Sequence, residues 1–187
     1  MTQSRKVELK LLLPSPEAEL LHPAREFLES CLKEGLIKNL PEIPPAVMIP
    51  GHPGRQAAAS NRFMTNKIVF DPAEFKAPVE IQAGLILHEL IHVSQNQRPA
   101  TFLYLILRNP FYHFLGQEAE ANKFEAAFYS EIMKKGLEDS EMYTQTLLSE
   151  YQDATQSQAY ALGTLDSTLT FIWRVAWVAA IFMSLVK

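Results

Sequence analysis

The sequence predicts an α+β fold that is mostly helical, with a small N-terminal sheet packed on a central helix. Two observations predict it. Short β-like segments bounded by prolines occur only before residue 71, and the segments after residue 78 carry apolar residues at helical spacing. The 187 residues, 48% of them apolar, suit one domain over residues 1–165, followed by an apolar C-terminal helix over residues 166–187.

The first elements follow from alternation and from the positions of proline and glycine. Residues 7–13 begin with alternating apolar side chains and predict a strand. A helix is predicted over residues 16–33, with Ser15 as its N-cap. Pro23 is expected to interrupt this helix, and Gly35 to end it.

Two further strands and three helices complete the expected fold. Their predicted ranges are 46–49, 67–70, 78–97, 117–135 and 138–162. The last of these helices is expected to end near Gly163. The apolar connection 101–115 has two interpretations: a buried segment lining the core or cleft, or a segment that seats the domain against a bilayer.

Composition excludes several classes of protein. The net charge is -4 and the pI about 5.7, without a Lys/Arg cluster, so we expect no nucleic-acid partner. Cys31 is the only cysteine, which excludes an intrachain disulfide and a Cys-rich zinc ribbon. The apolar run 11–13 is too short for a secretory signal, so the catalytic part is expected in the cytoplasm.

Residues 169–186 form an apolar segment of about 18 residues with one charge, Arg174. That length is near the minimum for crossing a bilayer, and Trp173 and Trp177 suit a membrane interface. One interpretation is a tail anchor that contacts the membrane through residues 169–186 and leaves the body in the cytoplasm. The other is an amphipathic or core helix that packs on the domain.

The motif that carries chemistry is His88-Glu89-Leu90-Ile91-His92, an HExxH sequence within a predicted helix. Positions i and i+4 share a helix face, so His88 and His92 can bind one metal ion. Glu89 is rotated by about 100° from His88 and lies beside that ion, where it can take a proton from a bound water.

A catalytic zinc ion needs a third protein ligand and an open position for water. The metzincin pattern is excluded, because Gln95 and Arg98 stand where it requires Gly and His. No Asp occurs between His92 and Asp139. The remaining candidates are Glu118, Glu120, Glu125 and His113, of which Glu118 is preferred. Asn122, one helical turn after Glu118, is expected to support a metal ligand from outside the coordination shell.

The HELIH motif and the later Glu118-Ala119-Glu120-Ala121-Asn122 segment resemble the gluzincin metallopeptidases. The segment is similar to the ExxAD signature of CAAX prenyl proteases and heat-shock metallopeptidases, and the chain length resembles the minigluzincins. The resemblance covers residues 67–135 and implies a zincin-like fold, with Glu118 as zinc ligand and residues 67–70 as the strand that binds extended peptide. Asn122 departs from the family, which has Asp there.

The expected function is therefore a zinc metalloendopeptidase that acts on a peptide or protein substrate, with metal ligands His88, His92 and Glu118 and with Glu89 as general base. The alternative is a catalytically silent zinc-binding module that captures peptides or partner proteins, which the Asn122 departure keeps open. Nothing in the sequence selects the oxyanion donor from its chemically able candidates, Arg55, Tyr112, His113 and Tyr151.

Overall fold

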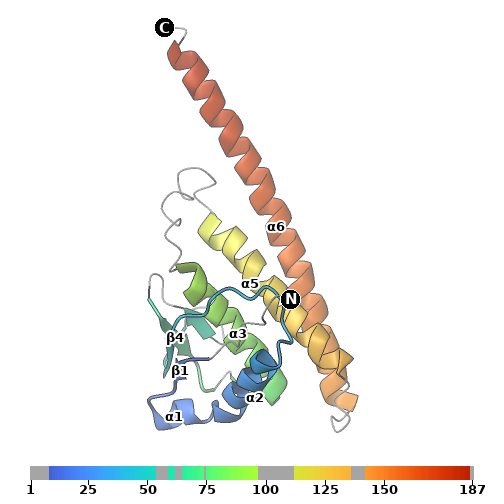
Figure 1. The fold of residues 1–187 in the computed structure, drawn as a ribbon. Helices are drawn as coiled ribbons and strands as arrows, with labels where there is room; N and C mark the ends of the chain where they lie inside the picture. Colours follow the sequence, from blue (N-terminus) through green and yellow to red (C-terminus); the bar gives the residue numbers. More distant parts are fainter. Residues whose placement is uncertain are drawn as a thin grey trace, which may run out of the picture.

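The structure is a computed structural model that describes residues 9–53, 59–61, 65–73, 75–96, 112–135 and 142–185. It has a small sheet on one side of helix α3 (Val79–Asn96), helix α5 (Tyr112–Lys134) on the other side, and helix α6 (Met142–Leu185) alongside α5 (Figure 1). The expected α+β, mostly helical fold with a small sheet is confirmed.

The sheet has four strands in the order β1-β2-β4-β3, which are β1 (Leu11–Leu12), β2 (Ala46–Pro50), β4 (Lys67–Phe70) and β3 (Ala59–Asn61). The first three are parallel, and β3 pairs antiparallel with β4. The strand expected over residues 7–13 is reduced to Leu11–Leu12 within the described part, which begins at residue 9. Strand β3 was not predicted, because three residues are too few to show alternation.

The helix expected over residues 16–33 is divided in two, α1 (Pro16–Glu19) and α2 (His22–Lys33). Ser15 caps the first, since its Oγ accepts a hydrogen bond from the backbone N–H of Ala18 at 3.2 Å. The break directly precedes Pro23, where a proline is tolerated as the first turn of a new helix. Gly35, with φ of 71°, adopts the left-handed conformation that follows the end of α2.

Helix α3 is the centre of the core. Its apolar side chains are buried on several faces, because α2, β3 and α5 all pack on it. Gly84 is required for the contact with α5: a Cβ atom there would overlap the ring and hydroxyl of Tyr129. Because Gly84 has no side chain, helices α3 and α5 can approach each other closely at this position.

Helix α6 differs from its prediction. It was expected to end near Gly163, but it continues without interruption to Leu185, across the expected domain boundary between residues 165 and 166. Gly163 faces α5, where an added Cβ would meet the Cβ of Ala119 at 4.0 Å. The segment Thr144–Leu185 is, among the described residues, the one helix long and apolar enough to cross a membrane, and an 18-residue window of it has a mean hydropathy of 1.6. Figure 1 shows its C-terminal half extending beyond the rest of the molecule.

Candidate metal site

Helix α3 presents His88 and His92 side by side, one turn apart. Their ring centroids are 4.8 Å apart at an interplanar angle of 74°, and the two Nε2 atoms lie 3.1 Å apart. The side chains are 14% and 12% exposed, so little water reaches them from the flanks. The two imidazoles therefore converge on one point, as the i, i+4 spacing predicts.

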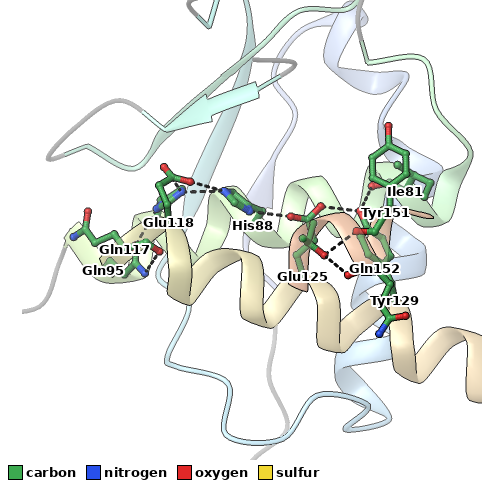
Figure 2. Close-up of polar contacts among 11 residues, drawn as sticks. Ile81, His88, Gln95, Gln117, Glu118, Glu125, Tyr129, Tyr151 and Gln152 are labelled. Carbon is green, nitrogen blue, oxygen red and sulfur yellow. Dashed lines mark hydrogen bonds and ion pairs between the residues drawn. The ribbon is translucent and has the colours of Figure 1, made fainter. Parts of the chain in front are cut away.

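Helix α5 supplies the third group. Glu118 Oε2 lies 3.3 Å from His88 Nε2, and Glu118 Oε1 lies 3.2 Å from His92 Nε2 (Figure 2). These three residues form, within the described part of the chain, the group that could hold a metal ion. The Glu118 side chain is 44% exposed, so the site opens toward solvent on its side.

The spacing of the two imidazoles fits a tetrahedral ion. Bonds of about 2.0–2.1 Å, typical of zinc to nitrogen or oxygen, give a tetrahedron with edges of roughly 3.3 Å. The two Nε2 atoms, 3.1 Å apart, are close to that edge, and each oxygen of Glu118 lies near one imidazole, Oε1 3.2 Å from His92 and Oε2 3.3 Å from His88. His88, His92 and Glu118 would hold such an ion with three protein ligands, which would leave a tetrahedral ion one position for water or substrate.

Both histidines are held through their other ring nitrogen. Nδ1 of His88 lies 2.9 Å from Glu125 Oε2, and Nδ1 of His92 lies 2.9 Å from Gln95 Oε1. A carboxylate oxygen can only accept from His88, so the proton of the neutral ring is on Nδ1. The Gln95 amide is oriented in the same sense, because its Nε2 donates to the Gln117 carbonyl at 3.0 Å and to Glu120 at 2.9 Å. The two Nε2 atoms are thereby left as acceptors.

The two Nε2 atoms and the Glu118 carboxylate are all acceptors, and they repel one another unless a positive charge lies between them. Without an ion, that charge is a proton. Burial alone would lower the pKa of His88, but hydrogen bonds with Glu118 and Glu125 outweigh it and raise the pKa to about 10. Burial would likewise raise the pKa of Glu118, but its contacts with both imidazoles hold it well below its usual range. The site is therefore built to hold positive charge.

Glu125 connects the site to the core behind it. Its Oε1 accepts a hydrogen bond from the Tyr129 hydroxyl at 2.8 Å, and that hydroxyl also lies 3.3 Å from the Ile81 carbonyl. Burial and the charge of Glu125 raise the pKa of Tyr129 well above its usual value, so the hydroxyl stays protonated and donates. Figure 2 shows the resulting line from Glu118 through His88 and Glu125 to Tyr129.

Glu89, the expected base, is buried beside the two imidazoles and 7% exposed. Its negative charge acts on both rings, since it contributes to the raised pKa of His88 and to that of His92. It is not among the three converging groups, so its carboxylate remains distinct from the ligand set.

Several expectations about the surroundings of the site are corrected. Asn122 was expected to support a metal ligand; the two histidine Nδ1 atoms are instead bonded by Glu125 and Gln95, and Asn122 is buried in α5. Two other candidate third ligands have different partners: Glu120 accepts a hydrogen bond from Gln95, and Glu125 accepts one from His88. Sequence reasoning missed Gln95, although its position three residues after His92 places both on one helix face.

The oxyanion candidates are only partly described. Arg55 and the side chains of Tyr112 and His113 lie outside the described residues, as does the apolar connection up to residue 111. Tyr151 packs edge-on against Tyr129, with ring centroids 6.1 Å apart, at the end of the line remote from Glu118 (Figure 2).

The geometry defines a candidate mononuclear metal site with two imidazoles and one carboxylate, held from behind by a carboxylate and an amide. Comparison of the chain with protein-family models, with curated proteins and with solved structures gives no match. A functional proposal therefore depends on the site itself.

Proposed function

We propose that this chain is a zinc-dependent metallopeptidase. The observation that carries the proposal is the convergence of His88 Nε2, His92 Nε2 and the Glu118 carboxylate at 3.1–3.3 Å, with Glu89 beside them. Two imidazoles and a carboxylate with one open position are the donor set of catalytic zinc in peptidases of the HExxH kind. A structural zinc site would be closed by a fourth protein ligand, and the converging group contains three among the described residues.

When bound, zinc lowers the pKa of a coordinated water to about 7 and polarises a carbonyl group. Glu89 takes the proton released by that water, then passes it to the amine that leaves when the peptide bond breaks. His88 and His92 stay fixed in the Nδ1-protonated tautomer by Glu125 and Gln95, so both keep Nε2 directed at the ion.

The substrate strand is assigned to β3 rather than to the strand first expected. Residues 67–70 form β4, which is flanked by β2 on one side and β3 on the other and so has no open edge for a peptide. Strand β3 (Ala59–Asn61) is at the edge of the sheet and packs against α3. An extended peptide would add there through backbone hydrogen bonds, with little demand on its sequence.

The test is Glu89→Gln, with Glu80→Gln on the same helix as the matched control. Metal content and hydrolysis of casein are measured for both variants and for the parent chain. Loss of a general base should lower the rate by about 10²–10⁴-fold while metal content stays at the parent level. A zinc-loaded Glu89→Gln protein that hydrolyses casein as the parent does would reject Glu89 as base. A zinc-loaded parent that hydrolyses nothing would favour a silent zinc-binding module instead.

The apolar part of α6 is proposed as an anchor that holds the domain on the cytoplasmic face of a membrane. Its support is the length and hydropathy of the helix and the exposure of its C-terminal half. Deleting residues 166–187 should move the chain from the membrane fraction to the soluble fraction of cells. An unchanged distribution would remove the anchor.

A further inference from the structure

The segment of α6 over residues 175–183 has no polar face. Residues 175–183 are nine consecutive apolar residues, and at 100° per residue they pass around the helix more than twice. Every residue from Arg174 to Leu185 is exposed. A helix that packs on a partner helix or in a groove is apolar along one stripe and polar on the rest of its surface. A surface that is apolar on all sides fits a surrounding lipid phase, and we take a bilayer as its occupant.

The metal site lies close to the point where this surface begins. Helices α5 and α6 run antiparallel as a hairpin (Figure 1), and Gly163 of α6 lies against Ala119 of α5, the residue after Glu118. Along α6, Gly163 is followed by a polar stretch, Thr164 to Thr168, interrupted only by Leu165, and then by the apolar segment from Leu169. The polar stretch suits lipid headgroups, and the apolar segment suits the hydrocarbon.

The height of the site above the hydrocarbon follows from helix geometry. Leu169 is six positions after Gly163 along the helix, which at a rise of 1.5 Å per residue is roughly 9 Å. The headgroup layer on each side of a bilayer is about 5–8 Å thick. The Glu118 carboxylate, one residue from the Gly163 contact, therefore stands at about the outer edge of the headgroups.

We propose that α6 fixes the metal site at the bilayer surface, so that its substrates are juxtamembrane segments of other membrane-anchored proteins. This rests on the peptidase function proposed above. An extended chain advances about 3.3 Å per residue, so a segment that leaves the bilayer reaches the height of the site within about three residues. Tethering to the same bilayer also makes the encounter two-dimensional and raises the effective concentration of such substrates.

The position of α6 is tested on the full chain in phosphatidylcholine vesicles. Trp173 and Trp177 are the only two tryptophans, so Trp173→Phe and Trp177→Phe each leave one native fluorophore. Quenching by lipids brominated at different depths along the acyl chain reads the depth of each ring. Trp177 should lie deeper than Trp173 by roughly 6 Å, four residues along the helix. Absence of quenching, or equal depths as for a helix lying flat, would overturn the proposal.

The height of the site is tested by lengthening α6. A polar, helix-forming insertion of about eleven residues between Thr168 and Leu169 adds about three turns, or roughly 16 Å. The control carries the same insertion after Lys187. The substrate is a single-span protein whose juxtamembrane segment is a uniform repeat of a cleavable peptide. The parent should cleave nearest the bilayer, the control likewise, and the insertion variant about five residues farther out.

A soluble copy of the cleavable peptide separates the two proposals. Cleavage of the soluble peptide, without preference for the tethered substrate and without a shift in the insertion variant, would refute the surface location while leaving the peptidase proposal standing. If the zinc-loaded parent cleaves neither substrate, the peptidase proposal fails and the substrate class fails with it. The tryptophan depths still show whether α6 enters the bilayer.

Discussion

Replacing Glu125 by glutamine should weaken metal binding without changing any metal ligand. Glu125 accepts two hydrogen bonds, from His88 Nδ1 at 2.9 Å and from the Tyr129 hydroxyl at 2.8 Å. Glutamine has one acceptor oxygen and one donor nitrogen, so one of the two buried donors must face an N–H group. Loss of such support typically reduces metal affinity by about 10–100-fold, which corresponds to about 1.4–2.8 kcal/mol.

The affinity is measured by competition with a chromophoric zinc chelator. Glu131→Gln, on the same helix but bonded to Lys134 at the surface, is the matched control and should bind as the parent does. Adding Tyr129→Phe to Glu125→Gln removes the competing hydroxyl, which lets the amide oxygen serve His88, so the double variant should recover part of the lost affinity. An affinity for Glu125→Gln within about twofold of the parent, or an equal fall in the control, would refute the role given to Glu125.

Three further predictions concern ligands, packing and pH. Glu118→Ala should lower zinc affinity more than Glu125→Gln does, because it removes a ligand; equal affinity in the same competition assay would reject the third-ligand assignment. Gly84→Ala should destabilise the fold by about 1–3 kcal/mol in urea, since its Cβ would overlap Tyr129. Gly163→Ala, which meets Ala119 only in ordinary contact, should instead stabilise by up to about 1 kcal/mol; equal effects of the two changes would contradict the packing. Burial raises the pKa of Cys31 from 9.0 to about 11, so the folded chain holds this proton more tightly than the unfolded chain. The free energy of unfolding should therefore fall as pH rises from about 9 to 11, and Cys31→Ala should reduce that slope; an unchanged slope would exclude the thiol as its cause.

The candidate ligand residues could be predicted because their convergence depends on local spacing. Two histidines four residues apart on a helix share a face whatever the rest of the fold, and the structure brings them together as expected. Elimination left four candidates for the third ligand, and Glu118 was preferred because it opens the helical segment that ends at Asn122; it lies within 3.3 Å of both imidazoles.

The supporting residues could not be read from the sequence. Which α5 residue meets His88 depends on how α5 crosses α3, and that crossing is set by the contact between Gly84 and Tyr129 rather than by any short motif. The signature-based expectation placed the support one turn after Glu118, at Asn122, whereas the structure places it two turns after, at Glu125. Positions four and seven residues after Glu118 both lie on the same helix face as Glu118, so spacing alone could not distinguish Asn122 from Glu125.

The misplaced end of α6 has a similar cause. Glycine after a helical run usually marks a C-terminus, and Gly163 was interpreted in that way. In the structure Gly163 lies inside α6 beside Ala119 of α5, where even an added Cβ would make only an ordinary contact. A glycine permits a helix to end but does not require it, and Gly163 stays within α6, which continues alongside α5.

The distribution of the site over two helices has a consequence for folding. The two histidines belong to α3 and the carboxylate to α5, and residues 97–111 lie between these helices in the chain. An ion bound to all three acts as a cross-link that closes this loop, in the way that a disulfide closes one, and it does so only when α5 is in its native register. Metal binding would then favour the native register of α5, since a slipped α5 would offer the ion two ligands instead of three.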